Sequence, residues 1–217
     1  MLSKLQFFSL LAYTSHPAPG NQAHAQSRDA MYAIKMDRVV SGNPPIATSV
    51  RIAKAVAEKI QGGSFPGAFG ADVTLVPVTS TTLLKPGSLW VPYRLANALQ
   101  AGGLGSVRLF LRRTEPLPKA AFQTDPKRRP SLADQVRTLT VDSALDEPKR
   151  ILLVDDIITS GTTLLACADR LAERFAVPIS GFAAMRTISN AAEFRSIEDP
   201  CVGSVTLRQN GKPHRVP

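Results

Sequence analysis

The chain has 217 residues, of which 44% are hydrophobic and 20% are charged, as in an ordinary globular protein. Lysine and arginine outnumber aspartate and glutamate by 26 to 17, so the net charge is +9. A basic excess of this size favours anionic partners such as phosphorylated small molecules or nucleic acid. No apolar run reaches the ~18 residues that span a bilayer, and two cysteines are too few for a disulfide framework. The composition therefore argues against a membrane-spanning or disulfide-stapled protein.

The amino-terminal segment has some features of a secretory signal. Lys4 precedes an apolar stretch over residues 5–13, and the small-residue pattern Ala23-His24-Ala25 follows later. The apolar stretch is short, however, and a dozen mostly polar, proline-containing residues separate it from the cleavage site that would follow Ala25. We expect residues 5–13 to form a strand of the fold, and we expect the protein to be cytoplasmic.

Short apolar segments alternate along the chain with segments whose apolar residues have helical spacing. The expected strands cover residues 5–13, 72–78, 107–111, 150–154, 178–185 and, at an edge, 202–207. The expected helices cover residues 26–35, 46–60, 89–100 and 162–175. Such alternation predicts an α/β fold in which helices cover both faces of a parallel sheet. We expect a single domain over residues 1–217, with a core at 71–190 and a flanking amino-terminal part, or hood, at 1–70.

One stretch of the sequence carries most of the chemical information. Residues 151–154 are apolar, and Asp155 and Asp156 follow them directly. Soon afterwards a polar run begins a helix; its members are Thr159, Ser160, Gly161, Thr162 and Thr163. Ligands of an open parallel sheet lie beyond the carboxyl ends of its strands, where a sugar diol and a hydrated Mg²⁺ would relieve the repulsion between two carboxylates. The amides and hydroxyls of the polar run, at the positive end of a helix, suit a phosphate group.

Carboxylates for a ribose beside amides for its 5′-phosphate predict a phosphoribosyl-binding site. A strand that ends in acids before a helix also occurs for structural reasons alone, because Asp, Ser and Thr are good residues for starting helices. The full order of four apolar residues, two acids, two apolar residues and the polar run is much more restrictive than either half. We therefore favour the binding site over the structural explanation.

Residues 151–164 resemble the motif with which type I phosphoribosyltransferases bind 5-phosphoribosyl-1-pyrophosphate (PRPP). Within that family the whole chain is most similar to the ComF-like group, through Tyr13, the helix end Ile34-Lys35 and residues 74–78. The resemblance implies a type I phosphoribosyltransferase fold with a hood and a flexible loop. It also implies that Asp155 and Asp156 are catalytic residues that hold the ribose hydroxyls, directly or through Mg²⁺. The 5′-phosphate would be bound by Thr159, Ser160, Gly161, Thr162 and Thr163.

The resemblance further implies a reaction in which a small nitrogenous acceptor displaces pyrophosphate from PRPP. Lys85, in the loop after the strand at 72–78, is our candidate for helping the pyrophosphate to leave, although an ordinary solvated lysine is about as good an explanation. The proline-rich, basic segment 112–134 predicts a long exposed loop. Arg112 and Arg113 in it would close over the site as a flexible cover, or would simply form a basic surface run.

Two departures from the family pattern narrow this expectation. Relatives in the ComF-like group often carry an amino-terminal cysteine cluster for zinc, whereas this chain has no cysteine before Cys167. We expect Cys167 to be a buried thiol inside a helix. Purine-salvage relatives have an aspartate three positions after the second acid, and here that position is Thr159. This argues against a hypoxanthine/guanine-type enzyme and leaves the acceptor open. The oligomeric state is open too, although transferases that resemble this chain often form homodimers.

A second hypothesis is a non-catalytic PRPP or nucleotide sensor, or a nucleic-acid-associated protein of the kind that ComF-like resemblance to DNA uptake suggests. The basic segment 112–137 and the missing acid at Thr159 motivate it. Aromatic residues make up only 6% of the chain, and the basic loop contains just Phe122. Base stacking is thus poorly provided for, so we favour the transferase.

Overall fold

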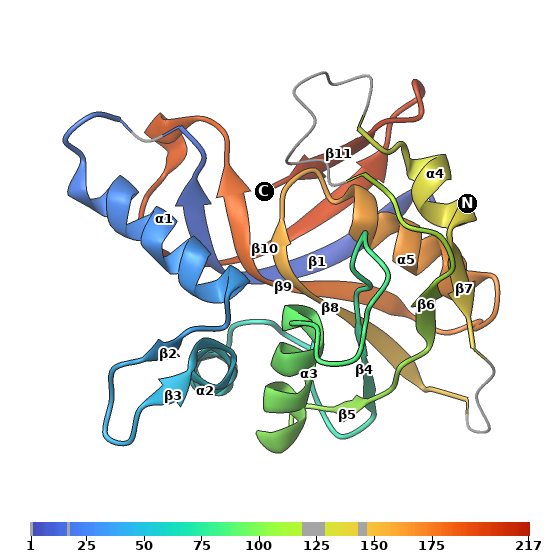
Figure 1. The fold of residues 1–217 in the computed structure, drawn as a ribbon, viewed down its shortest axis with the longest axis horizontal. Coiled ribbons are helices and arrows are strands. Elements are labelled where there is room, and N and C mark those ends of the chain that lie inside the picture. The colour runs from blue at the N-terminus through green and yellow to red at the C-terminus, as the bar shows by residue number, and fades with distance from the viewer. Residues whose placement is uncertain (1, 17, 119–128, 143–146) are drawn as a thin grey trace.

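A computed structural model describes residues 2–16, 18–118, 129–142 and 147–217. A seven-stranded sheet organises this part of the chain, in the order β11-β10-β1-β9-β8-β4-β5 (Figure 1). Its strands are β1 (Lys4–Thr14), β4 (Val73–Pro77), β5 (Ser106–Val107), β8 (Arg150–Ile158), β9 (Ile179–Ile188), β10 (Glu198–Leu207) and β11 (Pro213–Val216). The strands from β1 to β5 in this order are parallel, whereas β10 and β11 are antiparallel to their neighbours. The predicted α/β class is therefore confirmed.

Helices cover both faces of the sheet. The main helices are α1 (Gln22–Lys35), α2 (Thr48–Gln61), α3 (Val91–Ala101), α4 (Leu132–Arg137) and α5 (Thr162–Ala172), with a short 3₁₀ turn η3 (Ala191–Glu193). Figure 1 shows α1, α2 and α3 on one side of the sheet and α4 and α5 on the other. Two small antiparallel pairs complete the fold, namely β2 (Val39–Val40) with β3 (Ile46–Ala47), and β6 (Leu111–Arg113) with β7 (Leu139–Val141).

The alternation of side chains along the strands builds one core on each face. Phe8 and Leu152 pack with the buried residues of α1, α2 and α3. Their chain neighbours Phe7 and Leu153 face the other way and pack with α5 and the β6–β7 pair. Both faces are buried, which explains why the central strands are nearly continuous apolar runs.

The expected strand at residues 5–13 is confirmed as β1, which lies inside the sheet between β9 and β10. The strand expected at 202–207 is wrong as an edge strand, because β11 pairs with its outer side. The strand expected at 107–111 is divided between β5 and β6, which belong to different sheets. None of the helices within the described ranges combines the length and the apolar character needed to cross a bilayer.

Candidate functional site

The two acids lie on β8 beyond the point where its neighbour β4 has ended. Pro77, the last residue of β4, pairs with Val154, whereas the pairing of β8 with β9 continues to Ile158. The strand therefore carries Asp155 and Asp156 past the carboxyl end of β4, where open α/β sheets bind their ligands. We expected the strand to end before these acids. It continues through them because β9 still pairs with it.

Both carboxylates are oriented by the backbone of the strand itself. Oδ1 of Asp155 accepts the amide of Asp156 at 2.8 Å, and Oδ1 of Asp156 accepts the amide of Ile157 at 2.7 Å. Burial, and after it the neighbouring charge of Asp156, raise the pKa of Asp155 well above its usual range. A cation or a hydrogen-bond donor from a ligand would therefore relieve an unfavourable negative charge here.

One positive charge reaches the acid pair from the amino-terminal helix. Lys35, the last residue of α1, has its Nζ 3.7 Å from Oδ2 of Asp156. The Lys35 side chain is 48% exposed, so water screens much of this attraction. We assigned Lys35 to a helix from the sequence but gave it no role at the site. The sequence gives no indication that Lys35 lies near Asp156, because α1 and β8 are far apart along the chain.

Residues 159–163 form the turn between β8 and α5, which we call the phosphate turn. Gly161 is the N-cap of α5 and has a φ of +79°, in the left-handed region that favours glycine. It offers no side-chain cap, so the first amides of α5 are left for another acceptor. The hydroxyls of Ser160 and Thr162 lie 2.9 Å apart within the same turn. These amides, at the positive end of an 11-residue helix, suit an anion.

The phosphate turn rests directly on strand β10. A Cβ atom at Gly161 would overlap the side chain of Val205, which is fully buried. Glycine is thus required here both by the backbone conformation and by this close approach. The sequence indicated a glycine that lets the chain bend, but it gave no indication of the strand beneath it.

A cavity of about 570 Å³ lies at this edge of the sheet, within the size range of small-molecule sites. Asp155 and every residue of the phosphate turn line it, so the structure brings an acid and the turn to one space. Asp156 is not among the residues that line it. Other walls come from residues outside the motif, namely Arg129, Pro130, Gln135, Thr187, Ser189, Pro213, His214 and Arg215.

The loop from β4 to α3 lies at the same edge of the sheet as the acids. The indole nitrogen of Trp90 donates to the carbonyl of Val78 at 2.8 Å and so ties the two ends of this loop together. The amide of Lys85 donates to the Ser88 hydroxyl at 3.1 Å, and Lys85 itself is exposed. Lys85 is not among the residues that line the cavity. Its part in pyrophosphate departure stays a prediction.

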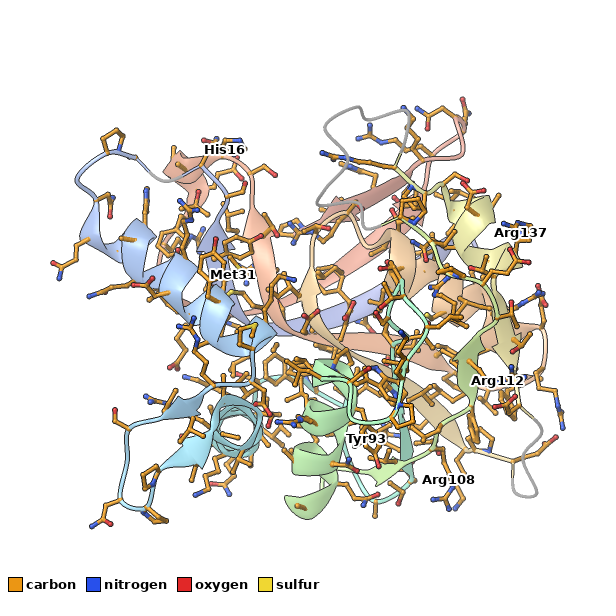
Figure 2. The ribbon with its side chains drawn as sticks, in the orientation of Figure 1. His16, Met31, Tyr93, Arg108, Arg112 and Arg137 are labelled. Atoms are coloured by element: carbon orange, nitrogen blue, oxygen red, sulfur yellow. The ribbon has the colours of Figure 1, made fainter. Side chains whose placement is uncertain are left out.

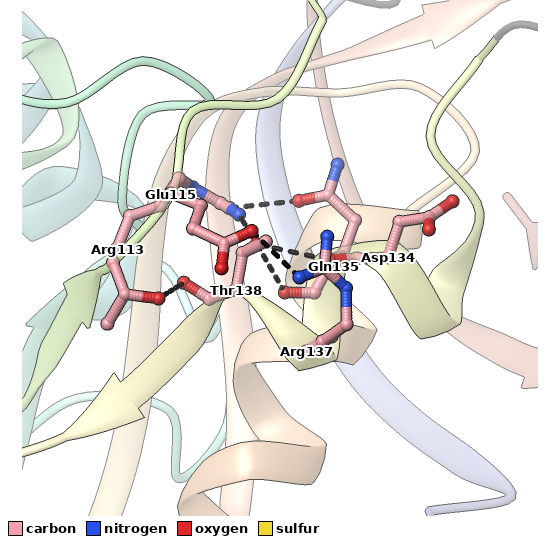
Figure 3. Close-up of polar contacts among 7 residues, drawn as sticks. Arg113, Glu115, Asp134, Gln135, Arg137 and Thr138 are labelled. Atoms are coloured by element: carbon pink, nitrogen blue, oxygen red, sulfur yellow. Dashed lines mark hydrogen bonds and ion pairs between the residues drawn. The ribbon is translucent and has the colours of Figure 1, made fainter.

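Arg113 is a buried residue of β6 rather than part of an exposed loop, and it is 6% exposed. Its guanidinium donates to the carbonyl of Ser80 at 2.7 Å. It also donates to Oε1 of Gln135 at 2.9 Å and to the hydroxyl of Thr138 (Figure 3). Burial lowers its pKa. Arg113 therefore connects the loop after β4 with α4, and Gln135 carries that connection to the wall of the cavity.

Arg112 points away from this network. Its Nε lies 3.4 Å from Oδ1 of Asp142, and the two side chains are 62% and 49% exposed. Figure 2 shows Arg112 on the flank of the molecule where β6 lies. It is not among the residues that line the cavity, so a contact with a ligand there would require the segment to move. The role of Arg112 and Arg113 in closing over the site therefore stays a prediction.

Cys167 is confirmed as a fully buried thiol of α5. Burial raises its pKa to about 12, so it offers no reactive thiolate near neutral pH. Among the residues that the structure describes, no cluster of three or more His, Cys, Asp or Glu side chains could hold a metal ion by itself. Asp155 and Asp156 nevertheless fit Mg²⁺, which takes one or two carboxylates together with substrate oxygens and water.

No protein-family model and no curated protein matches this sequence. Solved structures that resemble the chain include a hypoxanthine phosphoribosyltransferase of Staphylococcus aureus, at 13% identity over 68% of this chain and 69% of that one, with a TM-score of 0.35. A purine phosphoribosyltransferase of Pyrococcus horikoshii is 18% identical over 69% and 91%, with a TM-score of 0.34. The Trypanosoma cruzi hypoxanthine enzyme complexed with IMP is 14% identical over 85% and 88%, also at 0.34.

Proposed function

We propose that this protein is a PRPP-dependent phosphoribosyltransferase related to the ComF-like group. The observation that supports this most is that Asp155 and the whole phosphate turn line one cavity. An acid suited to a sugar hydroxyl and amides suited to a phosphate then face the same ligand. The weak structural likeness reported above adds no weight to this proposal, which stands on the chemistry of the site.

In this proposal the 5′-phosphate of PRPP binds the amides and hydroxyls of residues 159–163. Asp155 and Asp156 accept hydrogen bonds from the ribose hydroxyls and hold Mg²⁺. Bound Mg²⁺ would supply positive charge to the pyrophosphate group of the substrate. The ligand would thereby offset the raised pKa of Asp155, because it brings hydrogen-bond donors and a cation to a carboxylate that is costly to ionise alone.

The reaction needs little covalent work from the protein. A bond forms between the acceptor nitrogen and C1 of the ribose, the C1–oxygen bond breaks, and pyrophosphate leaves with the electron pair. The acceptor nitrogen loses its proton to water or to the departing pyrophosphate and so becomes neutral again. The residues contribute by holding C1 between the two reactants and by favouring charge on the leaving group. Lys85 is the candidate for the latter task, whereas Arg112 and Arg113 were assigned a closing role over the site.

The test is calorimetric titration with PRPP, with and without Mg²⁺, followed by an assay of pyrophosphate release over nucleobases and small amines. We expect Mg²⁺-dependent binding that is lost in Asp155→Asn and Asp156→Asn. Asp29→Asn is the matched control, because it removes an exposed carboxylate of α1 that does not line the cavity. Absence of PRPP binding by the wild-type protein, or turnover retained when both acids are replaced, would contradict the proposal.

A non-catalytic PRPP sensor is the second candidate. It is favoured by Thr159, which stands at the start of the phosphate turn and has no useful acid–base pKa. Such a sensor would bind PRPP with the same dependence on the two acids, but it would release no pyrophosphate with any acceptor. The two assays described above therefore separate the sensor from the transferase.

A further inference from the structure

Strand β11 brings an arginine to the phosphate turn from outside the motif. Nε of Arg215 donates to the carbonyl of Thr159 at 2.6 Å, and Nη2 donates to the carbonyl of Thr187. One guanidinium thus connects the first residue of the phosphate turn with the carboxyl end of β9. This contact ties together two of the segments that line the cavity.

The bond to Thr159 acts on the peptide group that leads into the turn. The carbonyl of Thr159 and the amide of Ser160 belong to one planar peptide, and in a trans peptide they point in opposite directions. A donor that fixes the carbonyl therefore also fixes the direction of the Ser160 N–H. A hydrogen bond to the carbonyl additionally polarises the peptide, which strengthens the N–H as a donor to an anion.

The same hairpin contacts the turn a second time through the strand partner of Arg215. Val205 of β10 pairs with Arg215 of β11 in the sheet register. Val205 lies under Gly161, at the place that a Cβ atom there would occupy. One cross-strand pair therefore supports the turn at its first residue and at its glycine. This double contact fixes the shape of the turn before any ligand arrives.

The charge of Arg215 also remains without a carboxylate partner among the described residues. Its Nη1 is buried from water and has no acceptor in that part of the chain, and the buried hydroxyl of Thr187 has none either. Both residues line the cavity. The guanidinium lies over the Phe7 ring, 5.9 Å from its centroid, and a buried donor without an acceptor is costly. An oxyanion in this cavity would therefore meet a positive charge that no carboxylate of the described residues neutralises.

We infer that the β10–β11 hairpin is part of the phosphate site, with Arg215 as its positioning residue. Arg215 fixes the Thr159–Ser160 peptide and contributes positive charge to the end of the cavity that receives a phosphate monoester. The inference rests on the proposed function, because it takes the ligand to be a phosphoribosyl compound. Beyond the proposed function, the inference states that β11 helps to bind the phosphate together with residues 159–163.

The experiment compares two probes that separate the ends of the ligand, ribose 5-phosphate and inorganic pyrophosphate with Mg²⁺. Their dissociation constants are measured by calorimetry for the wild type, Arg215→Gln, Arg215→Lys and Arg208→Gln. Arg208 is an exposed residue of the same hairpin region, so Arg208→Gln changes the net charge equally without touching the turn. Thermal unfolding of each variant reports whether it is folded.

We expect Arg215→Gln to weaken ribose 5-phosphate binding by about tenfold or more, as loss of a charge-assisted hydrogen-bond donor does. Arg215→Lys should recover part of this loss, because it keeps the charge but not the forked geometry. The dissociation constant of both Arg215 variants for pyrophosphate should stay within about twofold of the wild-type value. The same limit should hold for Arg208→Gln with both probes.

Unchanged ribose 5-phosphate binding by Arg215→Gln would overturn the inference while leaving the proposed function intact. Equal loss of both probes in a variant would also overturn it, because the arginine would then act on the fold as a whole. If Arg215→Gln does not fold, Arg215→Lys replaces it in the test. A loss of ribose 5-phosphate binding without a loss of pyrophosphate binding would then support the inference, and no such difference would overturn it. A wild-type protein that binds neither PRPP nor ribose 5-phosphate would instead contradict the proposed function, and the inference with it.

Discussion

The two ends of strand β8 carry opposite charges, and they differ in how far neighbouring residues neutralise those charges. At the amino end, Nε and Nη2 of Arg150 donate to both carboxylate oxygens of Asp72, at 2.8 and 2.7 Å, and the guanidinium also donates to the carbonyls of Gly67 and Phe69. At the carboxyl end, two adjacent acids share one exposed lysine whose Nζ lies 3.7 Å from one of them. The arginine at the first end is neutralised by Asp72, whereas the two acids at the second end have only this lysine nearby among the described residues.

If the proposed function holds, this contrast separates the end of the strand that serves stability from the end that serves binding. The Arg150 end has a partner for each of its donors, so changes there should lower stability without affecting a ligand. The acid end keeps a carboxylate whose pKa burial raises, so replacing that acid should lower the proposed binding and can even increase stability. Substitutions at each end test this division.

The largest effect is expected from Gly161→Ala, at the acid end. Alanine would have to adopt the left-handed conformation of Gly161, and its methyl group would overlap Val205. We therefore expect the free energy of unfolding to fall by about 2–4 kcal/mol. We also expect PRPP binding to be lost. Gly211→Ala is the matched control, since Gly211 has a φ of +73° and nothing within 4 Å of the new Cβ. Denaturant unfolding of both variants separates overlap from backbone strain. Equal losses in the two would show that Val205 does not confine the turn.

The second effect is expected from Arg150→Gln, at the opposite end. Glutamine cannot reproduce the forked contact with Asp72, and the carbonyls of Gly67 and Phe69 would lose a donor. We expect the melting temperature to fall by several degrees while PRPP affinity stays unchanged. A parallel loss of affinity would show that the two ends of β8 are coupled, against the division drawn above.

A smaller effect of the opposite sign is expected from Asp155→Asn without ligand or Mg²⁺. Because the pKa of Asp155 is raised in the folded protein, the unfolded chain loses this proton first as the pH rises from about 4. Wild-type stability should fall from there until the folded-state pKa is passed, and the variant should lack this fall. Near pH 7 we expect the melting temperature of Asp155→Asn to exceed that of the wild type by about 2–4 °C, which corresponds to ~1 kcal/mol of unfolding free energy in a chain of this length. Melting curves at several pH values measure this, and equal pH dependence would contradict it.

The smallest effect is expected from Arg112→Ala. Its ion pair with Asp142 is largely exposed, so the change in unfolding free energy should not exceed about 0.5 kcal/mol. PRPP binding should also be unchanged unless the segment closes over the cavity. A clear loss of affinity would therefore support the predicted closing role for Arg112, and denaturant unfolding would exclude a general loss of stability.

Much of the fold was predictable because the central strands are long apolar runs between clear turn signals. The extent of β8 was not, since Asp155 and Asp156 look like the end of a strand in the sequence, and only the pairing with β9 carries the strand through them. Arg113 was placed in an exposed loop because the segment 112–134 is proline-rich and basic. Its burial depends on Gln135 and Thr138, which lie further along the chain and cannot be read from its neighbours.

Of the predicted motif residues, Asp155 and residues 159–163 line the cavity and Asp156 does not, and the motif gave no indication of the cavity's other wall. His214 and Arg215 belong to a four-residue strand that contains a proline and has no apolar pattern. Such a strand has no sequence signal of its own, and it exists because β10 offers an edge to pair with. Lys35 was missed for a related reason, because its contact with Asp156 joins segments that are remote in sequence.

The position of β1 between β9 and β10 has a consequence for how the chain folds. The first strand pairs with Gly181 and its neighbours on one side and with Gly203 and its neighbours on the other. These contacts have very large sequence separations, and folding slows as such separations increase. On the ribosome, β1 must wait without partners until nearly the whole described chain has been synthesised. The phosphate turn, which needs Val205 beneath it, is therefore expected to be among the last parts of the molecule to reach its final shape.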